Sequence, residues 1–192
     1  MAIQYRRGFK TEANDIAREV RTEMGIRTAD RLDPHQLAEH LSIPIIPLSG
    51  FEADAPLAHT RFGGEETFAF SAVTVFYGTR RAIVYNDFQP VGRQANNIAH
   101  EASHGLLHHP PTPAIDDRGC RNWHKEVEDE ANWLAGVLLI PEDTALYIAR
   151  QQWPIEQAAE RFGVSVELLR WRLNMTNAYN RVNRWKASMG RC

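Results

Sequence analysis

The chain has 192 residues, of which 43% are hydrophobic, so it is long enough for one well-packed domain with an appendage. Its formal net charge of −2 excludes a protein whose whole surface binds polyanions. Two cysteines, Cys120 and Cys192, are too few for a disulfide framework and indicate a reducing, cytoplasmic setting. No apolar stretch approaches the roughly 18 residues of a membrane span, so we expect no membrane segment.

The first quarter of the sequence predicts two helices and a strand. Thr11 is expected to cap the first helix, and Gly25 is a natural stop for it. Asp33 followed by Pro34 then predicts the start of a second helix, which we expect to pack with the first in the core. Residues 43–48, which are apolar but include two prolines, suit an edge strand.

The next segment predicts a loop over residues 51–64 and then a pair of strands. Residues 67–77 are rich in β-branched and aromatic side chains, and residues 82–85 form a second strand after a turn. An exposed edge strand in front of the following helix can hold an extended peptide through backbone hydrogen bonds. An ordinary hairpin fits the same residues.

The following helix carries the pattern His-Glu-x-x-His from His100 to His104. Positions four apart share one face of a helix, so both imidazoles can reach one zinc ion. Glu101 is turned by about 100° from His100, which leaves its carboxylate beside the metal, where a general base belongs. The alternative is a partly buried helix whose histidines only make hydrogen bonds, and a third ligand decides between the two.

A later helix, predicted from about residue 122 to Pro141, offers acidic candidates for this third ligand. Glu130 projects toward the buried stripe that includes Val127 and Leu134. A carboxylate on the core side is costly unless it is paired or bound to a metal, so we predict Glu130 as the third ligand. The remaining acidic residues suit a solvated first turn that the helix dipole favours. These are Glu126, Glu128 and Asp129.

This His₂Glu set leaves a fourth position open for water, as hydrolytic zinc sites require. A three-histidine pattern would need its third histidine ten positions after the first, where Pro110 stands. His108 continues the column of the two motif histidines and can orient a neighbour or polarise a carbonyl, although a packing role fits equally. Cys120 could reach a metal in principle, but a lone loop cysteine more often has no such role.

Two segments resemble the ImmA/IrrE family of zinc metallopeptidases. They are the motif from His100 to His108 and residues 128–141, which read Glu-Asp-Glu-Ala-Asn-Trp-Leu-Ala-Gly-Val-Leu-Leu-Ile-Pro. The resemblance implies an α+β fold with a zincin-like metallopeptidase core, a small mixed or antiparallel sheet and an active-site helix pair. It also implies Zn²⁺ on His100, His104 and a glutamate of the later helix, with Glu101 catalytic.

Members of that family often lie beside a helix-turn-helix repressor and cleave it. The resemblance therefore implies a zinc-dependent endopeptidase whose protein substrate is such a repressor, encoded nearby in a mobile element or a stress response. Glu101 would take a proton from the attacking water and pass it to the leaving amine. His124, Tyr85 and Tyr147 are candidates for stabilising the oxyanion. The alternative is a zinc-containing regulatory or DNA- or protein-binding sensor with little peptidase activity.

Residues 153–192 predict helix-turn-helix-like helices, packed on or appended to a metallopeptidase domain that comprises residues 1–152. Ser165 is expected to cap the second of these helices. From Leu168 to Cys192 the chain has six Lys or Arg residues, several aromatic residues and no acidic one. Such a composition is compatible with nucleic acid, but similar helices in the ImmA/IrrE family pack on the peptidase. We therefore favour protein docking, with at most weak nucleic-acid contact.

Overall fold

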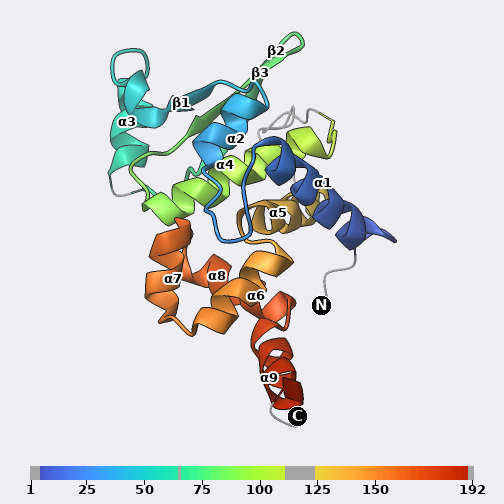
Figure 1. Ribbon diagram of the computed structural model, residues 1–192. Coiled ribbons are helices and arrows are strands. Elements are labelled where there is room, and N and C mark those ends of the chain that lie inside the picture. Colours follow the sequence, from blue (N-terminus) through green and yellow to red (C-terminus); the bar gives the residue numbers. More distant parts are fainter. Residues whose placement is uncertain (1–4, 65, 111–123, 190–192) are drawn as a thin grey trace.

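The computed structural model has a mixed α+β fold, as the sequence predicts, and describes residues 5–64, 66–110 and 124–189 (Figure 1). The helices before residue 111 are α1 (Phe9–Glu23), α2 (Pro34–His40), the short 3-10 helix η1 (Leu48–Phe51), α3 (Pro56–Gly63) and α4 (Val91–Leu106). Those after it are α5 (Lys125–Leu139), α6 (Glu142–Gln151), α7 (Ile155–Phe162), α8 (Val166–Met175) and α9 (Ala178–Met189). The strands are β1 (Ile45–Pro47), β2 (Ala72–Tyr77) and β3 (Arg80–Tyr85).

Two predicted helix caps are confirmed. The Asp33 carboxylate accepts a hydrogen bond from the backbone N–H of His35 at 2.9 Å and so begins α2. The Ser165 hydroxyl accepts one from the backbone N–H of Leu168 at 3.1 Å and begins α8 in the same way. Both helices therefore start where a local side chain satisfies an N–H group that has no partner within the helix.

Two other predicted boundaries are wrong. α1 begins at Phe9 rather than at Thr11, after Gly8, whose φ of 84° is a left-handed conformation that glycine adopts at little cost. The predicted loop over residues 51–64 contains α3, which has Pro56 at its first position. Neither helix begins with a side chain that caps its first N–H groups. A capping residue therefore could not mark either start in the sequence.

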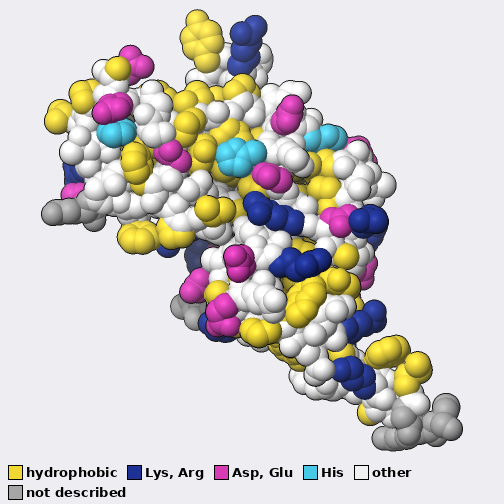
Figure 2. Space-filling model, turned by 60° about the vertical axis from the view of Figure 1, so that its left-hand side comes forward, with side chains coloured by type: hydrophobic (Ala, Val, Ile, Leu, Met, Phe, Trp, Pro, Cys, Tyr) yellow, Lys and Arg dark blue, Asp and Glu magenta, His cyan; other side chains and the backbone are white. Residues whose placement is uncertain are grey.

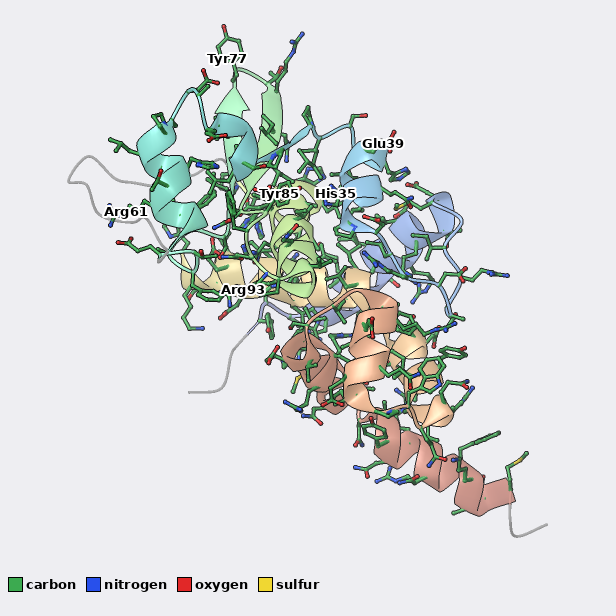
Figure 3. The ribbon with its side chains drawn as sticks, turned by 90° about the vertical axis from the view of Figure 1, so that its left-hand side faces the viewer. His35, Glu39, Arg61, Tyr77, Tyr85 and Arg93 are labelled. Atoms are coloured by element: carbon green, nitrogen blue, oxygen red, sulfur yellow. The ribbon has the colours of Figure 1, made fainter. Side chains whose placement is uncertain are left out.

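The three strands form one small sheet in the order β1-β3-β2. β1 runs parallel to β3 and lies at one edge, as its prolines require, whereas β2 runs antiparallel to β3 and forms the other edge. Ile83 and Tyr85 of β3 belong to a small core with Ala38, Ile43 and Ile98, the last of which lies on α4. The β2–β3 hairpin extends outward from this core to the exposed Tyr77 (Figure 3). The sheet therefore rests on α4, the helix that carries the histidine motif.

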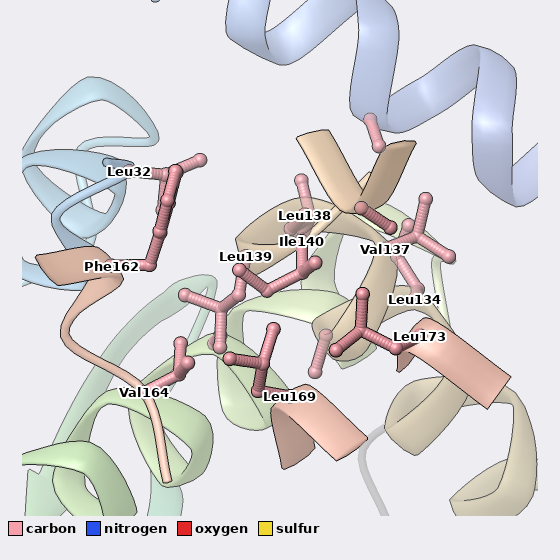
Figure 4. Packing of buried hydrophobic residues seen from close by; sticks show 14 of the residues in the cluster. Leu32, Leu134, Val137, Leu138, Leu139, Ile140, Phe162, Val164, Leu169 and Leu173 are labelled. Carbon is pink, nitrogen blue, oxygen red and sulfur yellow. The ribbon is translucent and has the colours of Figure 1, made fainter. Parts of the chain in front are cut away.

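A larger core surrounds α5 and joins the two ends of the chain. Residues 131–140 are all buried except Asn132. Figure 4 shows part of this cluster, in which side chains of α5 meet residues from α8, from the end of α7 and from the segment before α2. Since the same cluster includes residues of α1 and α9, the C-terminal helices pack on the rest of the chain. A domain boundary between residues 152 and 153 remains a prediction. Among the helices of the described ranges, none has the length and apolar character needed to cross a membrane.

α8 crosses α5 at Gly136. A Cβ atom at this position would lie 2.4 Å from Cζ3 of Trp171 and 3.1 Å from Cδ of Arg172. The buried Arg172 donates a hydrogen bond from Nε to the carbonyl of Ile140, 2.8 Å away at the end of α5, and burial lowers the pKa of Arg172 to about 10. Because Gly136 has no side chain, α8 can approach α5 closely at this position. The hydrogen bond from Arg172 then holds α8 to the end of α5.

We expect Gly136→Ala to lower the free energy of unfolding by about 1–3 kcal/mol, because the new methyl group overlaps the Trp171 ring. In an exposed helix the same change would raise the free energy of unfolding by up to about 1 kcal/mol. A decrease therefore indicates that α8 packs closely against α5 at this position. Urea unfolding measures it. Gly50→Ala is the control, since a Cβ atom there would have Pro47 Cγ as its nearest neighbour at 3.9 Å. A Gly136→Ala protein at least as stable as the wild type would contradict the close contact of α5 and α8.

Candidate metal centre

Two histidines of α4 lie where this helix packs against α5. His100 and His104 are one turn apart, and their Nε2 atoms are 3.1 Å from each other. The buried face of α4 consists of small or aliphatic side chains, which allow α5 to approach closely. These are Ala95, Ile98, Ala99, Ala102 and Ser103. The arrangement of the two imidazoles on one face of the helix is the one predicted from their spacing.

Glu128 of α5 completes a group of three potential metal ligands. Its Oε2 lies 3.3 Å from Nε2 of His100, and its Oε1 lies 3.7 Å from Nε2 of His104. The three residues can each offer one atom such that all lie within 4.8 Å of one another. Tetrahedral zinc with bonds of about 2.05 Å needs ligand atoms about 3.3 Å apart, and two imidazole nitrogens with one carboxylate oxygen are among its usual ligands. These three side chains therefore fit a zinc ion.

This geometry favours Glu128 over the predicted Glu130 as the third ligand. The Glu130 side chain is largely buried at 13% exposure, but its carboxylate lies 3.0 Å from Arg6 Nε and 3.5 Å from His109 Nε2. Two positions along a helix differ by about 200°, so Glu128 and Glu130 point in nearly opposite directions. The buried carboxylate of Glu130 has Arg6 as its partner, as the cost of burying a charge requires. The packing of α5 on α4 places Glu128 beside the histidines instead.

Glu101 is held by a threonine of the sheet. Thr74, in the middle of β2, donates a hydrogen bond from Oγ1 to Oε2 of Glu101 at 2.6 Å. The negative charge of Glu101 also acts on His100, whose pKa it helps to raise. The sequence did not identify Thr74, because threonine is common in strands and only the packing of β2 on α4 brings it to this carboxylate.

The second ring nitrogen of each histidine is held as well. Nδ1 of His100 lies 3.0 Å from Oδ1 of Asn132, and Nδ1 of His104 lies 2.9 Å from Nδ1 of His109. Neither partner was singled out from the sequence. Asn132 could have been found from its position four residues after Glu128, which places both on one face of α5. His109 had no such signal, because it lies beyond the end of α4.

The surroundings shift the pKa values of the two candidate ligand histidines in opposite directions. Burial, together with the neighbouring His100, lowers the pKa of His104 to about 4. Burial also acts to lower the pKa of His100, but its hydrogen bond to Glu128 and the charges of Glu101 and Glu128 outweigh it and raise the net value. His104 is therefore neutral at pH 7 and keeps the lone pair that a metal requires.

The accessory residues predicted from sequence lie elsewhere. His108 is exposed in the turn after α4, and His124 is exposed at the start of α5, where its side chain makes no capping hydrogen bond. Tyr85 packs its ring against His35 of α2 with centroids 5.4 Å apart (Figure 3). Within the described residues, no hydrogen bond, ion pair or ring contact joins these three side chains to His100 or His104. The suggestion of Cys120 as a ligand falls outside the described residues.

Comparison with models of protein families gives a match. The family model for a peptidase family, described as the IrrE N-terminal-like domain, matches residues 38–174 and so includes the whole of α4 and α5. None of the curated proteins and none of the solved structures matches the chain significantly. The matched range extends across the residues of the proposed boundary at 152–153 and through most of α8.

We expect Glu128→Gln to weaken zinc binding more than Glu130→Gln does, because only the first change removes a charged ligand atom. Loss of an outer partner typically costs about 10–100-fold in metal affinity, so Glu130→Gln should stay within that range and Glu128→Gln should exceed it. Competition with a chromogenic chelator measures the dissociation constants. Glu126→Gln, at an exposed position of the same helix, is the control. The reverse order of the two effects would restore Glu130 as the ligand.

Proposed function

Because the chain belongs to the peptidase family with the IrrE N-terminal-like domain, we propose that it is a zinc-dependent endopeptidase with a zincin-like core. The observation that carries this proposal is the convergence of His100, His104 and Glu128 beside a glutamate, Glu101, that a strand residue holds in place. A purely structural metal site would have no need of an additional carboxylate fixed next to it. Peptide hydrolysis uses such a carboxylate for proton transfer.

In the proposed reaction the chain supplies metal ligands, a base and a support for that base. Zinc bound by the three ligands would provide a Lewis acid that polarises the scissile carbonyl and acidifies water. Glu101 takes a proton from the attacking water and returns it to the leaving amine. Since the Thr74 hydroxyl donates to Oε2 of Glu101, we expect Oε1 of the same carboxylate to accept that proton.

The free edge of β2 supports binding of an extended polypeptide. In the sheet order β1-β3-β2, the described strands flank β2 on one side only, so its other edge can pair with a further strand. Thr74 joins this strand to Glu101, so a peptide added there would run past the proposed base. We propose on this ground that the substrate is an unfolded or extended segment of a protein.

The identity of that substrate rests on the resemblance to ImmA/IrrE proteins, which points to a helix-turn-helix repressor encoded nearby. We propose that α7 and α8 serve this protein interaction and do not read DNA. A groove of about 840 Å³ runs along the junction of α4 with α7 and α8, and its wall includes Asn132 of the candidate centre and Arg93 of α4. Three glutamates of α7 and α8 also line it and would repel phosphate groups. They are Glu156, Glu160 and Glu167.

The start of α8 is engaged within the molecule. A Cβ atom on Gly92 of α4 would lie 2.6 Å from the backbone N of Ser165, so the turn before α8 rests directly on α4. DNA-reading helices of this type present their first turns to the bases. The basic residues of α9 are a weaker candidate for nucleic acid, because Arg181 pairs with Glu142 at 2.5 Å. Figure 2 shows Lys and Arg side chains interspersed with exposed hydrophobic ones at this projecting end, a mixture that suits a protein partner.

We expect Glu101→Gln to reduce cleavage of the repressor by about 10²–10⁴-fold and to leave zinc content unchanged, because it removes the base but no ligand. Co-expression with the candidate repressor followed by mass spectrometry gives the cleavage site, and purified zinc-loaded protein gives the rate. Thr74→Val should cause a smaller loss, since the base stays but loses its support. Full activity of Glu101→Gln would refute the assigned base. Absence of cleavage by the zinc-loaded wild type would favour the sensor hypothesis instead.

We expect DNA binding to be weak and steeply dependent on salt, because only the electrostatic contribution of the C-terminal basic residues is available. Fluorescence anisotropy with labelled duplexes at about 50 and 200 mM salt measures it, and the pair Arg184→Glu and Lys186→Glu should reduce what binding there is. A tight, sequence-selective complex at physiological salt would contradict the assignment of α7 and α8 to protein docking.

A further inference from the structure

α4 ends in a turn that folds His109 back onto His104. His108 has a φ of 53°, in the left-handed region, and its N–H donates to the carbonyl of Gly105 at 3.1 Å. The N–H of His109 donates to the carbonyl of His104 at 3.0 Å. This pair of hydrogen bonds is the Schellman ending of a helix, in which the chain reverses direction after one left-handed residue. If α4 continued as a regular helix, His108 would be the neighbour of His104 on the next turn. Because the chain reverses, His109 is the residue that contacts His104.

His109 connects the candidate ligand His104 to two charged side chains. Its Nδ1 lies 2.9 Å from Nδ1 of His104, and its Nε2 lies 3.5 Å from Oε2 of Glu130. Oε1 of Glu130 lies 3.0 Å from Nε of Arg6, just before α1. The side chains of His109 and Glu130 are 9% and 13% exposed, so their polar atoms depend on one another rather than on water.

The ends of this chain of contacts determine where its protons lie. Arg6 can only donate, and an ionised Glu130 can only accept. With Glu130 as the acceptor, we expect His109 to carry its proton on Nε2, which leaves Nδ1 as an acceptor. His104 must then carry its proton on Nδ1, and its lone pair lies on Nε2, the atom that faces His100 and Glu128.

We propose that His109, held by Glu130 and Arg6, is a positioning residue that fixes the ring orientation and the tautomer of His104 for metal binding. This inference rests on the proposed zinc site. Histidine ligands commonly donate their second N–H to a carboxylate or a carbonyl, which holds the ring and makes it a better ligand. Here the imidazole of His109 accepts from His104 instead, and the carboxylate of Glu130 contacts His109 rather than the ligand itself. The role of Glu130 thus changes from ligand to anchor of this chain, and the segment before α1 becomes part of the support of the metal centre.

A pair of substitutions at His109 tests this role. Glutamine can accept from Nδ1 of His104 through its carbonyl and donate toward Glu130 through its amide, whereas leucine of similar size can do neither. We expect His109→Leu to weaken zinc binding by about 10–100-fold and His109→Gln to keep most of the affinity. Chelator competition measures the dissociation constants, and the visible spectrum of the cobalt-loaded protein reports the ligand geometry. It should change for leucine and not for glutamine.

Two further variants separate this role from effects on folding. His108→Gly should leave zinc affinity unchanged, because glycine readily adopts the positive φ of this turn. Arg6→Gln changes a half-exposed side chain that is not expected to be needed for folding, and it should weaken zinc binding by about 2–5-fold. If His109→Leu does not fold, Arg6→Gln decides, and an affinity equal to the wild type would overturn the proposal.

The outcomes distinguish this inference from the proposed function. A wild-type protein that binds neither zinc nor cobalt would overturn the metal site and the positioning role together. A wild type that binds zinc, with the same affinity and cobalt spectrum in His109→Leu, would overturn the positioning role alone. Equal losses of affinity in the leucine and glutamine variants would also overturn it, because the hydrogen bonds would then not be the cause.

Discussion

The close packing of α4 on α5 is the interaction on which the candidate site depends. Both helices present small side chains at their contact, among them Ala99 and Ala102 on α4 and Ala131 on α5. Small side chains allow two helix axes to approach, and only then can a carboxylate from one helix reach imidazoles on the other. The sheet rests on the same helix α4 and brings Thr74 to Glu101. α8 in turn crosses α5 at Gly136, further along that helix.

The polar side chains of the candidate site are held by neighbouring polar side chains. Nδ1 of both candidate ligand histidines is engaged, one by Asn132 and the other by His109. Rings held in this way lose little further freedom when a metal binds, so the site is organised before binding. Glu130 and His109 would be costly to bury alone, but together with Arg6 they form a chain that serves both the fold and the site.

The C-terminal helices illustrate why a local pattern does not by itself define a function. α7, the turn and α8 have the order and the Ser165 cap of a helix-turn-helix unit. In this protein, however, α8 packs on α5 at Gly136, and the turn before α8 rests on α4 at Gly92. The same supersecondary unit therefore acts as part of the wall of a groove next to the candidate centre. A motif can be reused as scaffold wherever its exposed surface is covered by the rest of the chain.

The sequence by itself determined the features that depend on local spacing. The facing histidines of α4, the caps at Asp33 and Ser165 and the mixture of helices and strands all follow from residues a few positions apart, where helix and strand periodicity apply. The contacts that join different elements at the candidate site could not be obtained in this way. The choice of Glu128 over Glu130 depends on the angle between two helices, Thr74 reaches Glu101 only through the packing of the sheet, and His109 meets His104 only because one residue turns left-handed. These contacts join residues whose relative directions are set by tertiary packing or by one backbone angle, and no periodic pattern in the sequence records either.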